Sequence, residues 1–348
     1  MSLGRTRRTP ATVWVESWFA SSAATFLELI RAELPQTRLI YTHRDPDQRA
    51  AAAADLCSTS VPLTAEDVVS FATTHDIDVV VPARNIGLVA RTTSRLAAAG
   101  VTVALPTADL GTLESMLDKQ RTYQMCEDHQ LALTPRWRVA IGARELLDVV
   151  GEWAARNEAC CIKPTIGEGA AGFRVVDPGW NPSDALLEWP SVVVSPAELE
   201  RLVAGLGRDL PPMLVSDFLP GDETSVDVAS HDGEVIACVR RRKLSASTQV
   251  IERDPETEAV VNSISKHWAL HGCWNAQFRD DTAGQPRLLE LNPRPAAGSL
   301  YTAPIGANFP ALAVLLASGA DITPVRQPDS YLICRRQVAD LVRTGASG

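Results

Sequence analysis

Three oxygen-bearing side chains fall on two short segments in which apolar and polar residues alternate. Trp274–Phe278 and Pro286–Leu291 are predicted to be antiparallel strands, because the Asp-Asp-Thr-Ala-Gly stretch between them is typical of a hairpin turn. Side chains two residues apart share one face of a strand, so a hairpin in register would bring together Gln277, Glu290 and Asn292. Carboxylate and amide oxygens suit Mg²⁺, which usually keeps substrate phosphates among its ligands. Taken alone, such a trio is more often an ordinary part of a protein surface.

A glycine-rich stretch is a candidate for binding phosphate. Lys163 ends an apolar run, and Gly167, Gly169 and Gly172 have the spacing Gly-x-Gly-x-x-Gly. In a dinucleotide-binding fold this loop would run into a helix, but here Phe173–Val176 is predicted to be a second strand. Glycine backbones let N–H groups close over phosphate oxygens, and the lysine adds a positive charge. The sequence therefore predicts a flap over phosphates, with a glycine-rich hairpin turn and a surface lysine as the alternative.

Two further phrases complete a recognisable order. Lys119 belongs to an Asp-Lys-x-x-x-Tyr phrase, and Phe-Leu-Pro-Gly-x-Glu-x-Ser-Val-Asp spans Phe218 to Asp227. Together with Asn-Ala-Gln-Phe and Leu-Leu-Glu-Leu-Asn-Pro-Arg, these motifs follow one another as they do in ATP-grasp enzymes, and the resemblance covers nearly the whole chain. The glutamine at 277 makes the chain most similar to the branch that contains the large subunit of carbamoyl-phosphate synthetase.

The resemblance implies a role for each motif. Glu290 would bridge two Mg²⁺ ions, or Mn²⁺, with Gln277 and Asn292 completing their shells. Lys119 and Lys163 would hold the phosphates of ATP. The remaining nucleotide contacts would be the flap glycines, the adenine hinge and the ribose-binding acid: Gly167, Gly169, Ser216, Asp217, Phe218, Leu219 and Glu223.

Catalytic roles are implied for Arg294 and Lys163. Arg294 would stabilise the transferring phosphoryl group or orient the acceptor carboxylate. Which of Arg240, Arg241 and Arg242 faces the site stays open. None of the six histidines lies in a recognisable motif, so no general base is named.

The activity implied is that of a carboxylate–amine ligase, which activates a carboxylate as an acyl phosphate and releases ADP and phosphate when an amine attacks. The substrates expected are an amino acid or small peptide in a biosynthetic pathway, and a homodimer is possible. The alternatives are phosphoryl transfer of the carbamoyl-phosphate type and a nucleotide-binding module without catalysis. The latter would predict a damaged metal set, yet all three oxygen ligands are present.

The elements that must position these residues are of the α/β class. Apolar runs alternate with helical patterns from Thr12 to about Leu110, which predicts a parallel sheet with helices on both faces. The resemblance implies an ATP-grasp fold with a parallel β/α domain (1–110), a connecting helix (111–135), a small mobile flap lobe (136–215) and a C-terminal antiparallel-sheet lobe with the metal site (216–348). Leu110–Gln130 is predicted to be one long helix.

Length and composition limit the partners and the cellular compartment that we expect for this protein. The chain has 348 residues, 45% of them hydrophobic, and a formal net charge of −9, which argues against a nucleic-acid partner. Its seven cysteines show no Cys-x-x-Cys spacing and fit reduced thiols. No run of about 18 apolar residues predicts a membrane span, so we expect a cytoplasmic protein.

Overall fold

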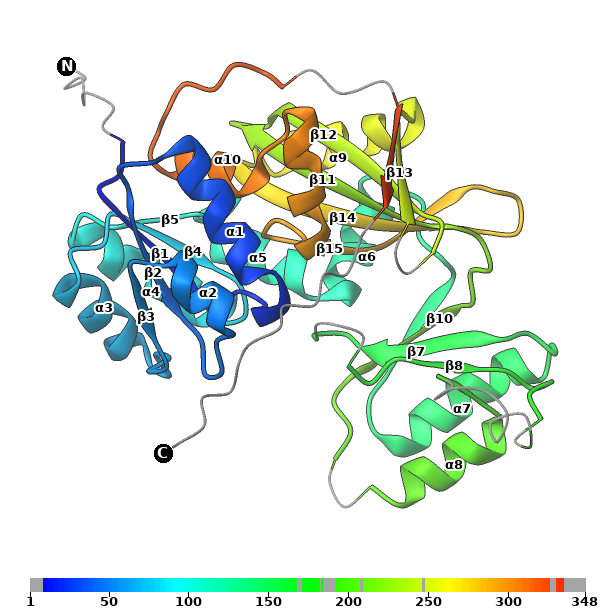
Figure 1. Cartoon of the computed structure of the whole chain (residues 1–348). Helices are drawn as coiled ribbons and strands as arrows, with labels where there is room; N and C mark the ends of the chain where they lie inside the picture. Colours follow the sequence, from blue (N-terminus) through cyan, green and yellow to red (C-terminus); the bar gives the residue numbers. More distant parts are fainter. Residues whose placement is uncertain are drawn as a thin grey trace, which may run out of the picture.

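The computed structural model of the chain describes residues 9–167, 171–181, 183, 192–206, 209–245, 248–325 and 330–334, and these residues contain three β-sheets (Figure 1). A parallel sheet, a smaller mixed sheet and a largely antiparallel sheet follow one another along the chain. This confirms the predicted α/β class.

The first sheet is parallel and has the strand order β3-β2-β1-β4-β5. Its strands are β1 (Thr12–Glu16), β2 (Arg38–Thr42), β3 (Leu56–Ser58), β4 (Val79–Pro82) and β5 (Thr102–Val103). Its helices are α1 (Ala20–Glu33), α2 (Gln48–Ala53), α3 (Ala65–Thr74) and α4 (Ile86–Ala98). Successive strand side chains alternate between faces, so Trp14 packs with the core under α3 and α4, whereas Val13 and Val15 pack toward α1. Helix α2 is short, because it ends at Ala53 and β3 begins at Leu56.

Helices α5 (Leu110–Leu117) and α6 (Lys119–Asp128) replace the single helix predicted over Leu110–Gln130, so that prediction is wrong. Asp118 leaves the helical conformation, with φ −104° and ψ 111°, and its backbone forms a bridge with Ile166. Its carboxylate then accepts a hydrogen bond from the backbone N–H of Gln120 and caps α6. The break makes Lys119 the first residue of a helix.

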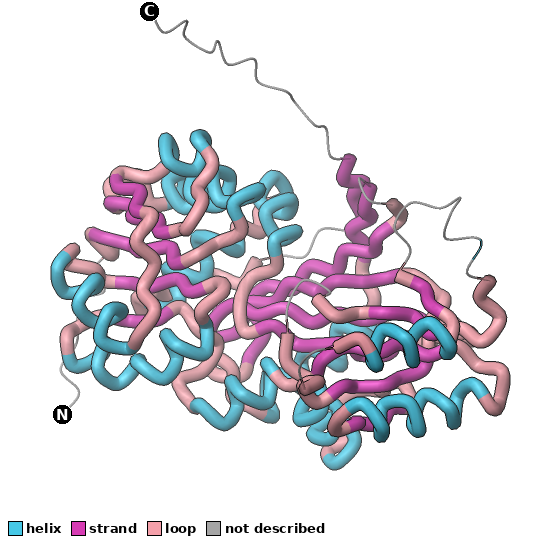
Figure 2. The backbone as a smooth tube through the Cα atoms, turned by 90° about the horizontal axis from the view of Figure 1, so that it is seen from below, coloured by secondary structure: helices cyan, strands magenta, loops and turns pink. Residues whose placement is uncertain are grey.

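The small lobe is built on the second sheet, with the strand order β6-β10-β7-β8-β9. Its elements are β6 (Trp137–Ala140), α7 (Ala143–Ala154), β7 (Cys160–Pro164), β8 (Arg174–Val176), β9 (Val193–Val194), α8 (Pro196–Ala204) and β10 (Met213–Asp217). Helix α8 begins with a capping box, in which Ser195 and Glu198 exchange hydrogen bonds. Figures 1 and 2 show α7 and α8 together over one face of the sheet, where they enclose a core around Trp153. Most of the segment between β8 and β9 lies outside the described residues.

The third sheet has the order β15-β14-β11-β12-β13-β16. Its strands are β11 (Glu223–His231), β12 (Glu234–Lys243), β13 (Thr248–Glu252), β14 (Gly272–Asp280), β15 (Pro286–Asn292) and β16 (Ser330–Cys334). The remaining helices are α9 (Pro255–His267), the 3₁₀ helix η2 (Ala297–Ile305) and α10 (Phe309–Ala317). Helices α6 and α9 cover one face, while α1 and α10 join the other face to the parallel sheet in one continuous core. Gly306, which has a φ of 89°, ends η2 and separates it from α10.

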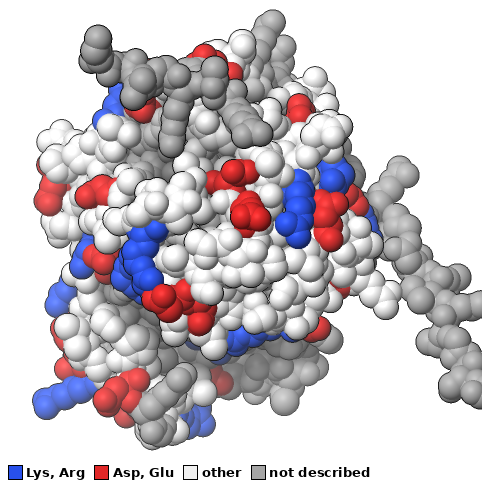
Figure 3. Space-filling model, turned by 90° about the vertical axis from the view of Figure 1, so that its left-hand side faces the viewer, with Lys and Arg blue, Asp and Glu red and all other residues white. Residues whose placement is uncertain are grey.

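No single described helix is long and apolar enough to cross a membrane. The bent pair η2 and α10, with an angle of 98° between them, passes that test only when its members are combined. On the face shown in Figure 3, acidic and basic side chains lie among one another in small groups. The six cysteines whose side chains are described are all unpaired thiols.

Candidate functional site

A cavity of about 230 Å³ lies where β7 of the small lobe, the start of α6 and the strands β11, β14 and β15 meet. It brings together six residues predicted for nucleotide and metal binding, from motifs that lie far apart in the sequence. It is lined by Lys119, Lys163, Pro164, Gly167, Ala171, Phe173, Glu223, Gln277, Arg279, Leu289 and Glu290. The described residues therefore place cations, acids and an amide around one cavity.

The predicted hairpin is formed by β14 and β15, and its register brings the three oxygen-bearing side chains together. Gln277 faces Glu290 across the two strands, and the amide of Asn292 donates a hydrogen bond of 3.3 Å to the Glu290 carboxylate. A bulge follows Gln277, which raises the local twist of the hairpin at this point. One carboxylate and two amides form an all-oxygen donor set, and this set fits Mg²⁺ with phosphate oxygens in its shell.

Lys119 is buried at the junction of three elements. Its backbone N–H donates to the carbonyl of Thr165 at 2.9 Å, so the first turn of α6 is attached to the end of β7. Its Nζ donates to the carbonyl of Gly167 at 3.1 Å and lies 3.5 Å from Oε2 of Glu290. The ammonium thus stands between the glycine-rich loop and the hairpin, where a phosphate on a metal ion would need it.

Lys163 extends from β7 toward the carbonyl of Leu289 on β15, to which its Nζ donates at 3.2 Å. The same carbonyl accepts from the buried hydroxyl of Tyr123 at 3.0 Å, so α6 and β7 are both tied to β15. Burial is the main cause that lowers the pKa of Lys163 to about 8, and the charge of Lys119 acts in the same direction. Glu290 opposes the shift by favouring the ammonium form.

The residues predicted as an adenine hinge lie at the end of β10 and just after it. The Asp217 carboxylate is held by the small lobe, because it accepts from the Arg136 guanidinium at 2.6 Å and from the Trp153 indole at 2.8 Å. The backbone N–H of Phe218 donates to Ala159. Ser216 is paired with β6 on one side and β7 on the other, and the backbone N–H of Asp217 donates to the carbonyl of Arg136, so these backbone groups are engaged within the small lobe.

Leu219 and Glu223 complete the predicted nucleotide contacts. For the backbone N–H of Leu219, no hydrogen-bond partner lies in the part of the chain that the structure describes. Glu223 lines the 230 Å³ cavity from the start of β11, and its carboxylate lies 3.6 Å from the ammonium of Lys243. Gly169 lies outside the described residues, so its predicted contact is not placed.

Each of the three consecutive arginines on β12 is paired with carboxylates. Arg240 and Arg242 share Glu252 at 2.6 Å, and Arg241 is buried against Asp227 at 2.7 Å. The Arg241 guanidinium packs directly over Gly298, where an added Cβ would stand 2.3 Å from Nη1. These arginines therefore build the sheet around the site.

Arg294 is buried beside the parallel sheet. Its Cζ lies 4.8 Å from the centre of the Phe19 ring, and Arg84 lies against the same ring at 5.4 Å. Phe19 follows β1 and Arg84 follows β4, which are neighbouring strands. No local motif marks Phe19 or Arg84 in the sequence, whereas Leu289 lies within the Leu-Leu-Glu-Leu-Asn-Pro-Arg phrase and Tyr123 ends the Asp-Lys-x-x-x-Tyr phrase.

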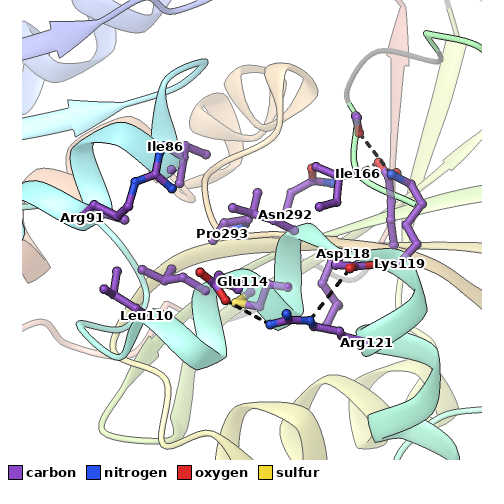
Figure 4. A pocket seen from close by; sticks show the side chains of 18 of the residues that line it. Ile86, Arg91, Leu110, Glu114, Asp118, Lys119, Arg121, Ile166, Asn292 and Pro293 are labelled. Atoms are coloured by element: carbon purple, nitrogen blue, oxygen red, sulfur yellow. Dashed lines mark hydrogen bonds and ion pairs between the residues drawn. The ribbon is translucent and has the colours of Figure 1, made fainter. Parts of the chain in front are cut away.

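A second cavity, of about 460 Å³, adjoins the first and shares Lys119, Gly167 and Glu290 with it. It lies between α4, α5 and the residues that follow β15 (Figure 4). Asn292 lines this second cavity. The hairpin of β14 and β15 therefore lies between two spaces: Gln277 faces the first, Asn292 faces the second, and Glu290 lines both.

Comparison with known proteins supports the predicted class. Residues 209–337 match a family described as "ATP-grasp in the biosynthetic pathway with Ter operon". The match covers less than half of the chain. No curated protein is similar in sequence.

Solved structures resemble nearly the whole chain. One is a biotin carboxylase domain dimer of 2-oxoglutarate carboxylase from Hydrogenobacter thermophilus with MgADP, ADP and bicarbonate (TM-score 0.68, 16% identity, covering 94% of this chain and 75% of that one). Another is an N5-carboxyaminoimidazole ribonucleotide synthetase with ADP (TM-score 0.67, 13% identity, covering 92% of this chain and 80% of that one). A third is an L-amino acid ligase from Bacillus licheniformis (TM-score 0.62, 15% identity, covering 89% of this chain and 75% of that one).

These likenesses define the class at the level of fold. The chain has the ATP-grasp fold, and its C-terminal part matches an ATP-grasp family. The resemblance to the carbamoyl-phosphate synthetase branch stays a prediction.

Proposed function

We propose that the chain is an ATP-dependent carboxylate–amine ligase that forms an amide bond and releases ADP and phosphate. The observation that carries this proposal is the meeting of Lys119, Lys163, Glu223, Gln277 and Glu290 around one cavity between the small lobe and the antiparallel sheet. Two ammonium groups, a ribose-type acid and a set of oxygen ligands together match the needs of a nucleoside triphosphate with its metal.

Mg²⁺ would be held by Gln277, Glu290 and Asn292, and it would neutralise charge on the phosphate oxygens. Lys119 and Lys163 add two positive charges beside the same hairpin. Phosphoryl transfer needs charge neutralisation and in-line positioning more than it needs a protein nucleophile. The residues that line the cavity meet that need without a general base.

In the proposed reaction, an oxygen of the substrate carboxylate attacks the γ-phosphorus of ATP, and the bond from that phosphorus to the β,γ-bridging oxygen breaks. The electron pair stays on ADP. An amine then attacks the acyl carbon, the carbon–oxygen bond to phosphate breaks, and the amine loses a proton as the amide forms. Arg294 would pair with the anion that is transferred or accepted, because its guanidinium suits planar oxyanions. Lys119, through Gly167, would hold the loop that keeps water away from the acyl phosphate.

The test is ADP release from ATP and Mg²⁺ in the presence of amino acids, offered singly and in pairs. Release that requires two of them together would establish a ligase and identify its substrates. Release with one carboxylate alone, trapped by hydroxylamine as a hydroxamate, would establish the acyl phosphate step.

Two glutamate variants test the proposed metal site in the same assay. Glu290→Gln should abolish release, because it removes the only carboxylate of the proposed ligand trio. Glu234→Gln is the matched control, since Glu234 is an exposed acid at the start of β12 that pairs loosely with Lys266 at 3.5 Å. Full turnover by the Glu290→Gln variant would contradict the metal site. ATP binding with no release under any condition would favour a non-catalytic module.

A further inference from the structure

The 460 Å³ cavity has the size of a small-molecule site and lies next to the proposed reaction centre. Figure 4 shows Arg91 and Leu110 on one side and Lys119 and Ile166 on the other, with Pro293 between them. The first side belongs to α4 and α5, and the second to α6 and the loop after β7. A molecule in this cavity would therefore span from the parallel-sheet domain to the hairpin.

The floor of the cavity is apolar. Ile86, Leu113 and Met116 are buried in it, and Leu291 contributes from β15. Two further apolar side chains remain exposed at its edge, since Leu110 is 41% exposed and Ile166 is 65% exposed. Covering such groups with an apolar ligand removes them from water, at roughly 25 cal/mol per Å² of apolar surface.

Two arginines line the mouth of the cavity. Neither Arg84 nor Arg91 forms an ion pair with any residue that the structure describes, and Arg84 rests on the Phe19 ring. Arg121 differs, because it lies 3.0 Å from the Glu114 carboxylate. In a chain with a net charge of −9, two unpaired guanidinium groups at one opening favour an anion.

The opposite end also favours an anion. Lys119 lies there, and Mg²⁺ held by Glu290 and Asn292 would outweigh the nearby acids, so with the metal bound a substrate carboxylate would be attracted and an ammonium group repelled. We propose that this cavity binds the substrate to be activated, and that this substrate has a carboxylate at one end, an apolar middle and a second anionic group at the other. The reacting carboxylate lies beside Glu290 and Lys119, and the second anion pairs with Arg91 and Arg84. This assignment rests on the proposed ligase function.

Binding can be measured without turnover by calorimetry on the nucleotide-free protein with Mg²⁺ present. Suberate, octanoate and octylamine serve as probes because they share an eight-carbon chain and differ only in their end groups. Suberate should bind at least about tenfold more tightly than octanoate, and octylamine should not bind. Equal affinities for suberate and octanoate would overturn the proposal.

Arginine variants locate the second anion. Arg91→Ala should lower suberate affinity about tenfold, to the level of octanoate, and should leave octanoate affinity unchanged; Arg91→Lys should restore part of the difference. Arg95→Ala is the matched control, because Arg95 lies one turn further along α4 and pairs with Glu66 at 2.6 Å outside the cavity. Unchanged suberate binding by Arg91→Ala and Arg84→Ala would overturn the proposal.

A second measurement separates this inference from the ligase proposal. Suberate that binds through Arg91, but gives no hydroxamate with ATP, Mg²⁺ and hydroxylamine, would leave the pocket assignment standing and count against the ligase chemistry. Hydroxamate formed from other acids by a protein that does not bind suberate would support the ligase and overturn the pocket assignment.

Discussion

The Nζ of Lys119 lies 3.5 Å from Oε2 of Glu290, and the same ammonium donates to the carbonyl of Gly167. One cation thus joins the start of α6, the hairpin of β14 and β15, and the glycine-rich loop. The side chain of Lys119 is 7% exposed and that of Glu290 is 25% exposed, so water screens this pair less than a surface pair. A bound phosphate group would compete with Glu290 for the Lys119 ammonium.

Replacing this lysine should weaken nucleotide binding. Lys119→Met should raise the dissociation constant of ATP with Mg²⁺ by about 10- to 100-fold, because a hydrogen bond to a charged group contributes about 1.5–3 kcal/mol. Calorimetric titration measures the change. Lys266→Met, at an exposed lysine of α9, should bind ATP like the parent protein. Equal affinities in the two variants would remove Lys119 from the phosphate site.

ATP binding should depend on pH through Lys163. Its pKa is lowered from 10.5 to about 8, so the free protein holds an ammonium below that pH and loses it above. Bound phosphate favours the ammonium, so ATP affinity should fall between about pH 7 and about pH 9, and binding near pH 8 should take up protons. Titrations in buffers of different ionisation enthalpy detect that uptake. Lys163→Arg should bind with little proton uptake, because arginine stays charged.

The lowered pKa of Lys163 also makes the free energy of unfolding depend on pH. The slope has the opposite sign to that expected for a lysine whose pKa is raised by an ion pair. Between about pH 8 and 10.5 the unfolded chain keeps a proton that the folded chain has lost, so this group makes the free energy of unfolding rise with pH. Below about pH 8 both states are protonated, and the cost of burying the ammonium is present in full. Thermal unfolding of the parent protein and of Lys163→Met across this range should differ in slope.

The parts of the fold that could be predicted from the sequence are those with local causes. The hairpin of β14 and β15 follows from alternation and a turn, and the start of α8 follows from Ser195 and Glu198. The break at Asp118 could not be predicted in this way, because its cause is a bridge to Ile166, a residue in a different lobe. Helical periodicity continues through that position, and only the tertiary contact interrupts it.

The residues of the candidate site also differ in whether the sequence alone could predict their roles. Gln277, Glu290 and Lys119 could be assigned from motifs, but the pairing of the arginines on β12 could not. Alternation suggests that some of them face the phosphates, whereas the nearby acids Asp227 and Glu252 neutralise them. Those acids lie on neighbouring strands, so their effect appears only when the register of the sheet is known.

The buried pair of Arg241 and Asp227 should be essential for stability. Asp227→Ala should lower the free energy of unfolding by about 3–5 kcal/mol, because it leaves a buried guanidinium without its counter-ion. Gly298→Ala should also destabilise, since its new Cβ would stand 2.3 Å from Nη1 of Arg241. Gly151→Ala, in a helix where a Cβ meets nothing within 4 Å, is the control and should be neutral or slightly stabilising. Denaturant unfolding measures all three, and a Gly298→Ala variant as stable as its control would contradict the close packing.

The ring of Phe19 should couple the parallel-sheet domain to catalysis. Arg294 lies on this ring at 4.8 Å and Arg84 at 5.4 Å, so the ring helps to hold two cations near the cavities. A cation–π contact contributes about 0.5–2 kcal/mol, and Phe19→Leu removes it while keeping an apolar side chain. Turnover should then fall several-fold while the dissociation constant of ATP stays unchanged, because Arg294 loses its orientation and the nucleotide contacts do not. Phe19→Tyr keeps the aromatic face and should retain most of the activity. A Phe19→Leu variant with parent-like turnover would show that Arg294 is oriented by its other contacts, and an equal loss in Phe19→Tyr would indicate that the shape of the side chain matters more than its π face.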